Sequence, residues 1–325
     1  MRHNEDILNE EMSKSMRFPL ASGAWDSPHV KTELLLQAHM KRAQLPIVDY
    51  ATDTRSVMEQ AIRIVTAMLD VASDCGWAKT VRVCISILQS LTQGCFWDDS
   101  PLLQLPHVQA ESAVFEKLSR ILNSGSSFQA LLPWKLPQDA AVSASAASAK
   151  SAAAESLPPQ QCKDVLRTLS MLPRLHVTAR WTKDGSDDSA SEKSSGSDLR
   201  PSGANRVLVV LTNTENRAGA SFPAHAPRFP KAREEGWMLL VCAGDVLITS
   251  KRIGSRSSMV TRLTVPAGEA DDSDLVLHVM SDCYVGLDFS LALSSSGAAR
   301  YTNCRTQPPR CSPFMVFDGC CLQRC

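Results

Sequence analysis

The chain has 325 residues, 44% of them hydrophobic, and its 34 basic and 34 acidic residues give a formal net charge of zero. This length allows two or three domains, and the charge balance excludes attraction of the whole molecule to nucleic acid or membranes, so a binding surface must come from a local cluster. No apolar run reaches the roughly eighteen residues of a membrane span, and residues 1–6 are too polar to open a signal peptide. We expect a nuclear or cytoplasmic protein without membrane contact.

Residues 26–105 carry the strongest helical pattern. Ser27 is a candidate N-cap followed by Pro28 at the first helical position, which predicts a helix through Ala43. The apolar residues of this stretch cover nearly the whole circumference, so the pattern predicts a central helix enclosed by its neighbours.

Two further helices complete the predicted bundle. The first begins at residue 53 or 54, where Ser56 and Glu59 have capping-box spacing, and Cys75 and Gly76 end it. Its predicted apolar face comprises Val57, Ala61, Ile64, Val65, Met68 and Ala72. The next helix follows Trp77 and ends at Gly94. Three amphipathic helices with short breaks predict a compact antiparallel unit.

The composition changes after the bundle. Short helical pieces at residues 102–108, 114–122 and 162–172 flank residues 140–156, which are almost pure Ala and Ser and, lacking an apolar face, are predicted to be a linker. From Leu175 the hydrophobic period changes from 3.6 to 2. The strand candidates are residues 175–181, 206–211, 237–242, 246–251, 260–265, 275–280 and 287–293. Such short, evenly spaced strands predict an immunoglobulin-like sandwich.

The predicted fold class is therefore multidomain α+β. We expect an all-α bundle at residues 1–110, short helices and the Ala/Ser-rich linker at 111–172, and a sandwich at 173–293 with a disordered Ser/Asp-rich insertion at 184–202. Residues 294–325 are predicted to be a disordered tail. Five of the cysteines crowd this tail: Cys304, Cys311, Cys320, Cys321 and Cys325. Their spacing matches no common zinc pattern, so we expect neither a metal nor a cofactor.

Motifs of catalytic machinery are missing from the sequence. It contains no Gly-x-x-x-x-Gly-Lys-Ser/Thr phosphate loop and no Gly-x-Ser-x-Gly nucleophile elbow. His3, Glu5 and Asp6 superficially resemble a helicase box but follow no strand, so we interpret them as contacts at a helix start or between elements. We expect no catalytic residue in this chain.

Several segments match a known family in order and at consistent spacing. They are residues 2–6, 26–29, 34–39, 45–50, 52–54, 67–72, 76–77, 226–231, 234–237 and 280–288. Together they resemble the Sec63 homology domain, the accessory domain that follows the motor of Ski-type superfamily-two helicases. The resemblance implies a helical bundle, a helix-hairpin-helix-like module, here degenerate because its glycine-bearing hairpin is not recognisable, and an immunoglobulin/fibronectin-like β-sandwich. It also implies that the chain begins within the accessory domain.

The function implied by this resemblance is that of a non-catalytic accessory domain of an ATP-dependent nucleic-acid helicase. Such a domain would guide single-stranded DNA or RNA, which it binds weakly alone, and dock partner proteins. The implied partners are helicase motor domains, in cis or in trans, and other subunits of a complex. An alternative stays open: a pure protein-interaction scaffold without nucleic-acid contact.

The resemblance points to two arginines on the helix of residues 54–73. In related helicases this helix lies along the threaded strand, with a basic residue and a base-stacking aromatic about two turns apart. Arg63 falls at the aromatic position and Arg55 one residue from the basic position. A guanidinium plane can stack on a base, whereas the plain alternative is that Arg63 pairs with Glu59 one turn earlier.

A second candidate contact is the basic cluster of Arg228, Lys231 and Arg233. It would bind a phosphate backbone or an acidic partner, or else it is a solvated loop that Glu234 and Glu235 neutralise. Nearby along the sandwich, Asp282, Tyr284 and Asp288 flank Gly286. There we expect a structural role, with the tyrosine hydroxyl holding the turn.

Overall fold

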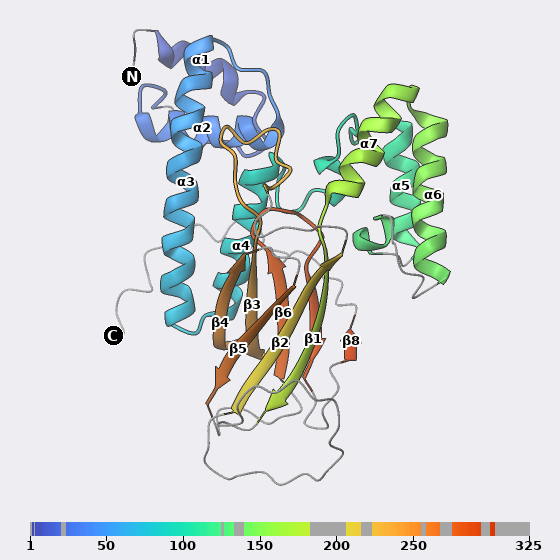
Figure 1. The fold of residues 1–325 in the computed structure, drawn as a ribbon. Helices are drawn as coiled ribbons and strands as arrows, with labels where there is room; N and C mark the ends of the chain where they lie inside the picture. Colours follow the sequence, from blue (N-terminus) through green and yellow to red (C-terminus); the bar gives the residue numbers. More distant parts are fainter. Residues whose placement is uncertain are drawn as a thin grey trace.

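Helices form the first half of the chain and antiparallel strands the second half in the computed structural model (Figure 1). The structure describes residues 2, 4–20, 24–124, 127–132, 140–182, 206–215, 223–254, 258–266, 275–293 and 300–302. The 184–202 insertion and the five C-terminal cysteines lie outside these residues. The mixed α+β prediction is confirmed.

The first helical group consists of α1 (Glu5–Ser13), α2 (Pro28–Lys41), α3 (Val48–Asp74) and α4 (Ala78–Gln93). Two predicted helix ends are confirmed: the Ser27 hydroxyl accepts a hydrogen bond from His29 N, and Gly94 ends α4 with a φ of 59°. Helix α3 begins at Val48, before the predicted capping box. Its first turn is held by Tyr50, which is fully buried against α1 and α2, so packing fixes this start without a side-chain cap.

Helix α2 is not the enclosed helix that its sequence predicts. Leu34, Leu35 and Ala38 are buried, but Thr32 and Glu33 on its other side are exposed. The longest element, the 27-residue α3, packs against both α2 and α4 instead. The prediction was wrong because leucines at successive positions made α2 look apolar all round, although the polar residues before them, Thr32 and Glu33, suffice for a solvent-facing side.

The second helical group consists of η1 (Pro101–Gln104), α5 (Ala113–Asn123), η2 (Phe128–Leu131), α6 (Ala140–Ser156) and α7 (Pro159–Met171). The expected Ala/Ser-rich linker is in fact α6, so that prediction was wrong. Ala149, Ala152 and Ala153 are buried, and α6 packs against α5, η2 and α7. Alanine has the highest helix propensity, and a helix of small side chains can bury a face by close approach although it lacks a large apolar stripe.

The strands form two antiparallel sheets. The strands are β1 (Arg174–Thr182), β2 (Arg206–Glu215), β3 (Gly236–Ala243), β4 (Val246–Gly254), β5 (Ser258–Val265), β6 (Leu275–Ser281), β7 (Phe289–Ala292) and β8 (Arg300–Thr302). One sheet has the order β1-β2-β5 and the other β4-β3-β6-β7-β8. All seven predicted strands are confirmed. The expectation of a tail without strands was wrong, because β8 pairs with β7 through Tyr301 and Leu291.

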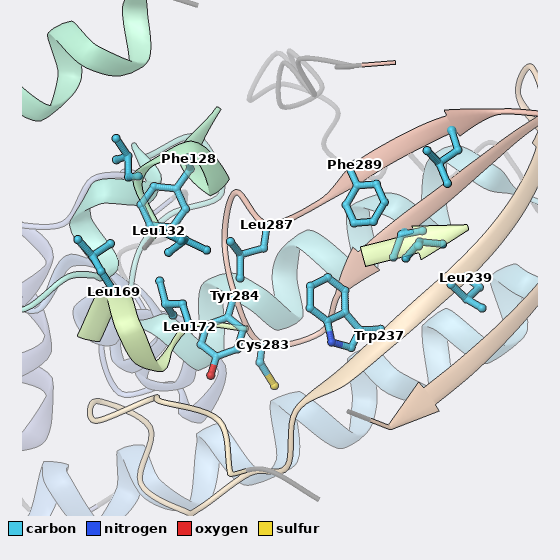
Figure 2. Packing of buried hydrophobic residues seen from close by; sticks show 14 of the residues in the cluster. Phe128, Leu132, Leu169, Leu172, Trp237, Leu239, Cys283, Tyr284, Leu287 and Phe289 are labelled. Carbon is cyan, nitrogen blue, oxygen red and sulfur yellow. The ribbon is translucent and has the colours of Figure 1, made fainter. Parts of the chain in front are cut away.

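The layers follow from which residues pack together. Leu69 of α3 and Ile85 of α4 pack on Met238 and Leu240, on the outer face of the five-stranded sheet. The inner faces of both sheets share one core, which also includes the second helical group. Figure 2 shows Tyr284 and Leu287, from the connection between β6 and β7, at the place where the second helical group meets the sheets. This connection, residues 281–288, is therefore common to helices and sheets.

Candidate nucleic-acid and partner interface

The 281–288 connection is fixed by side-chain amides from the helices. Four glutamines each donate through Nε2 to a main-chain carbonyl at 2.6–2.7 Å. In chain order the pairs are Gln89 with Ser281 O, Gln93 with Cys283 O, Gln104 with Val285 O and Gln129 with Leu287 O. Every second carbonyl of this connection thus has a side-chain donor, which satisfies main-chain groups where helices and sheets meet. We call this arrangement the glutamine ladder.

Asp288 closes the ladder at its α4 end. Its carboxylate accepts hydrogen bonds from Gln89 Nε2 and from Ser281 N, the latter at 2.8 Å. Burial raises the pKa of Asp288 to about 7, and the two donors act in the opposite direction. The group holds main chain and helix together, as the structural interpretation of this cluster predicted.

Tyr284 and Asp282 tie the ladder to residues 223–235, the segment before β3. The Tyr284 hydroxyl donates to Glu235 Oε1 at 2.7 Å and accepts from His225 N at 2.8 Å. It therefore holds this segment, whereas the sequence suggested that it holds its own turn. Asp282 accepts from Gly236 N at 2.9 Å and is ion-paired with Arg252. The two Tyr284 hydrogen bonds fix the segment that carries the predicted basic cluster, and the Asp282 contacts fix the adjoining ends of β3 and β4.

The basic cluster does not form one exposed surface. Arg233 is half-buried, donates to Thr92 Oγ1 at 3.3 Å and lies 3.8 Å from Asp282 Oδ2. Arg228 is half-buried against Gly94, and burial lowers its pKa to about 10. Lys231 alone of the three is exposed.

Within the part of the chain that the structure describes, neither acidic neighbour forms an ion pair with the arginines or the lysine of the cluster. Glu235 is buried against Tyr284, while Glu234 is exposed. Arg233 pairs instead with Asp282, 49 residues beyond it in the chain. That pairing was not visible in the sequence, because the two residues belong to separate segments.

The arginines of α3 point to different surroundings. Arg55 Nη2 donates to Pro230 O at 3.2 Å, which brings α3 next to Lys231. Arg63 is exposed, and among the described residues it forms neither an ion pair nor a hydrogen bond with Glu59. Lys231 is exposed and directly follows the residue that Arg55 contacts, and we call Arg55 and Lys231 the basic edge. Arg63 lies about two turns further along the helix.

Sequence reasoning missed an exposed apolar stripe on α3. Ile64, Met68 and Val71 have exposed fractions of 60%, 44% and 59%, although the pattern placed Ile64 and Met68 on the buried face. Beyond the helix end, Trp77 and Val246 are each 56% exposed and face each other in a β-bridge. The detectable signal was that the apolar residues of α3 span more of the circumference than one buried face needs. Exposed apolar residues gathered in this way mark contact surfaces.

A partly buried ion network lies near the N-terminal end of the bundle. Glu5 is 1% exposed and accepts from Lys31 Nζ at 2.6 Å, and Lys31 also pairs with Asp53 at 2.6 Å. Arg2 pairs with both acids. These contacts join α1, α2 and α3. The network agrees with the interpretation of Glu5 as a contact at a helix start.

Neither a metal cluster nor a membrane helix is present among the residues that the structure describes. These residues contain no group of three or more His, Cys, Asp or Glu side chains arranged to hold a metal ion. Within the same part of the chain, no helix has both the length and the hydropathy needed to cross a bilayer.

Comparison with known proteins identifies relatives that are much longer. Activating signal cointegrator 1 complex subunit 3 of Bos taurus is 34% identical over 312 residues, which cover 89% of this chain and 14% of that protein. DExH-box ATP-dependent RNA helicase DExH14 of Arabidopsis thaliana is 31% identical over 299 residues, 89% of this chain and 12% of that protein. U5 small nuclear ribonucleoprotein 200 kDa helicase of Mus musculus is 29% identical over 292 residues, with the same coverage. The chain thus spans 12–14% of the length of these relatives.

A family model agrees with these similarities. The model described as the Sec63 Brl domain matches residues 1–294. The resemblance stated from the sequence is confirmed: the chain belongs to the Sec63 Brl domain family and matches the accessory region of superfamily-two helicases.

Proposed function

We propose that this accessory region guides single-stranded nucleic acid along α3 and docks a helicase motor, while ATP hydrolysis belongs to that motor. The observation that carries the proposal is the state of Arg63, which is exposed on a long helix and not engaged by Glu59. A guanidinium held in this way offers a flat cationic face to a base. The names of two relatives, an ATP-dependent RNA helicase and a ribonucleoprotein helicase, favour RNA as the strand.

The basic edge of Arg55 and Lys231 supplies the backbone contact in this proposal. Arg55 lies eight residues before Arg63, about 12 Å along the helix axis. Its hydrogen bond to Pro230 O holds residues 223–235 beside α3, so Lys231 adds a second cation at that end. In our proposal a strand therefore lies along α3, stacked at Arg63 and neutralised at Arg55 and Lys231. In this proposal the half-buried Arg228 and Arg233 hold residues 223–235 in place through their contacts with Gly94, Thr92 and Asp282.

The glutamine ladder supports this role mechanically. It fixes α4 to the 281–288 connection, and α3 packs on both α4 and the five-stranded sheet. A guide needs such a fixed position relative to the rest of the protein. We further propose that the two sheets act as an immunoglobulin/fibronectin-like module, and that α5, α6 and α7 replace the helix-hairpin-helix module implied by the resemblance.

The exposed stripe of Ile64, Met68 and Val71 supports docking. A motor domain, in cis or in trans, or another subunit of a nuclear or cytoplasmic complex would bury it. Each aliphatic side chain taken from water contributes about 1.5–3 kcal/mol when fully buried. The same stripe favours the second candidate function, a scaffold that binds proteins and makes no nucleic-acid contact.

The two candidate functions predict different effects of Arg63→Ala on RNA binding. With a labelled single-stranded RNA at low salt, we expect Arg63→Ala to weaken binding about tenfold, since stacking on one base is worth roughly 1–3 kcal/mol. Arg55→Ala should mainly flatten the salt dependence, by about 0.7 for each phosphate that is no longer neutralised. Arg120→Ala, an exposed arginine on α5, is the matched control. If the chain joined to a motor binds and unwinds equally well with and without Arg63, the scaffold function is the correct one.

A further inference from the structure

A cavity beside α3 takes no part in the nucleic-acid proposal. Helix α3 lies next to β4 (Figure 1), and residues of both elements line a cavity of about 270 Å³. The buried side chains of Leu69, Leu88 and Met238 form its apolar lining. Asp70 and Asp74 of α3 also line it. The cavity thus combines an apolar surface with two carboxylates.

Asp70 and Asp74 carry negative charge that no described residue compensates. Both are exposed, and within the described part of the chain neither side chain forms an ion pair or a hydrogen bond. Side chains four residues apart on a helix are neighbours, so these two charges repel each other. They also lie near the C-terminal end of α3, where the helix dipole favours cations, yet the last turn of α3 contains no basic residue. A bound cation would relieve both effects.

The two cations that line the cavity are engaged by other groups. Arg252 forms an ion pair with the buried carboxylate of Asp282. Lys251 Nζ donates to a main-chain oxygen of β5 at 3.4 Å. Among the residues that the structure describes, neither cation pairs with Asp70 or Asp74. The acidic side of the cavity is therefore available to a cation from another molecule.

An arginine side chain matches this lining. It has an aliphatic stem and a guanidinium with five N–H donors. The stem would lie against Leu69 and Met238, and the guanidinium would donate to Asp70 and Asp74. The Ser73 hydroxyl also lines the cavity, and it is buried without a hydrogen-bond partner among the described residues, so it can accept a further donor. A phosphate group does not match, because the two carboxylates repel it.

Exposed apolar residues border the carboxylates and indicate that the arginine belongs to a protein. Val71 and Met68, two members of the apolar stripe, have exposed fractions of 59% and 44%. At 3.6 residues per turn, Val71 is about 60° around the helix axis from Asp74. A partner with an apolar residue beside its arginine would cover the stripe and fill the cavity together, whereas a small free cation would leave the stripe in water.

We propose that the cavity between α3 and β4 receives an arginine side chain of a partner protein whose neighbouring apolar residue covers Val71 and Met68. This inference rests on the docking part of the proposed function, and it adds the chemistry of the docked surface. It does not depend on Arg63. It also implies that a nucleic-acid strand follows α3 only as far as Arg63, because Asp70 and Asp74 repel phosphates beyond that point.

The test uses the full chain and two labelled, helix-forming peptides. One contains an arginine with leucines three and four residues after it, and the other has glutamate in place of the arginine. Fluorescence anisotropy at low salt should show saturable binding of the Arg peptide, at least tenfold tighter than that of the Glu peptide. Asp70→Asn/Asp74→Asn should weaken binding of the Arg peptide about tenfold, because the guanidinium loses its charge-assisted hydrogen bonds. Asp70→Arg/Asp74→Arg should reverse the preference between the peptides.

The matched control is Asp6→Asn/Glu10→Gln on α1. These two acids are also exposed and four residues apart on one helix, so their removal should leave binding of the Arg peptide unchanged. Thermal melting should show that Asp70→Asn/Asp74→Asn is folded, since this change removes a pair of like charges from the surface. Single-stranded RNA should bind that variant at least as tightly as the unsubstituted chain, because two charges that repel phosphates are gone.

Met68→Gln separates failure of this inference from failure of the docking proposal. If Met68→Gln weakens binding of the Arg peptide and Asp70→Asn/Asp74→Asn does not, the stripe docks a partner but the cavity does not receive its arginine. If neither variant changes the affinity, both proposals are wrong. The inference is also overturned if the Arg and Glu peptides bind equally well, or if the control on α1 weakens binding as much as the change on α3.

Discussion

Gln89 on α4 donates through Nε2 to both carboxylate oxygens of Asp288, at 3.0 and 2.9 Å, although the two residues are 199 positions apart. The same Nε2 reaches Ser281 O at 2.7 Å. One amide therefore joins the first helical group to the sheet that ends the fold. Because the pKa of this half-buried carboxylate is raised, its ionisation is linked to stability.

We expect Asp288→Asn to change how stability depends on pH. The pKa of Asp288 is about 7 in the folded state and about 3.9 in an unfolded chain, so between these values the folded state binds more protons. Its contribution is fully present below about pH 4 and is lost as pH rises through about 7, by at most about 1.4 kcal/mol per pH unit. Urea unfolding at several pH values should show a flatter profile for Asp288→Asn than for the unsubstituted chain. Asp6→Asn, at an exposed position of α1, should not flatten it.

Gly236 and Gly254 are cross-strand partners and provide a matched pair of substitutions. A Cβ at Gly236 would lie 2.5 Å from Asp282 Oδ2, whereas one at Gly254 meets nothing within 4 Å. Gly236→Ala should lower the free energy of unfolding by about 1–3 kcal/mol, as overpacking does, and Gly254→Ala should change it by under about 0.5 kcal/mol. Equal effects in chemical denaturation would contradict the close approach of Asp282.

Tyr284→Phe removes a hydroxyl that both donates and accepts. Glu235 Oε1 loses a donor and His225 N loses an acceptor, while the ring keeps its place in the core. We expect a loss of about 1–3 kcal/mol in the free energy of unfolding. Hydrogen exchange should increase within residues 223–235, and the His225 amide should show the largest rise. Protection that stays unchanged there would mean that the tyrosine does not hold the segment.

Met68 and Leu69 are neighbours on α3 with opposite surroundings. Met68 is 44% exposed, and Leu69 is 3% exposed and packed against the five-stranded sheet. Met68→Gln should leave the melting temperature nearly unchanged, whereas Leu69→Ala should cost about 2–5 kcal/mol. If α3 docks a motor, Met68→Gln should also weaken that association. A large loss of stability from Met68→Gln in the isolated chain would show that the stripe is core.

Local signals in the sequence predicted local structure well. Ser27 before Pro28, and Gly94 after an apolar helix, carry their conformational preference within a few residues, so both helix ends could be read directly. The start of α3 could not, because it depends on Tyr50 packing against helices distant in the chain. Helix α6 was missed for a related reason: the alanines that form its buried face look featureless until α5 and η2 supply the other side.

The candidate site was predictable only in part. Arg55 and Arg63 were found because both lie on one helix, where spacing alone sets their separation. The contact of Arg55 with Pro230 joins residues 175 positions apart, and the pairing of Arg233 with Asp282 joins two loops. Contacts of this kind depend on the topology of the fold, which hydrophobic periodicity and secondary-structure propensity do not encode. The basic cluster was therefore identified as residues, but the burial of Arg228 and Arg233 was not.

The glutamine ladder has a consequence for how this region changes during evolution. Its acceptors are main-chain carbonyls, which every amino acid provides. The residue at a position such as Val285 can therefore be substituted while the hydrogen bond is kept. The donors have no such freedom, because a shorter or apolar side chain at position 93 or 104 would leave a carbonyl without its hydrogen-bond donor. Divergent family members should therefore retain the glutamines while the residues opposite them vary, and correlated substitution would not reveal the contact.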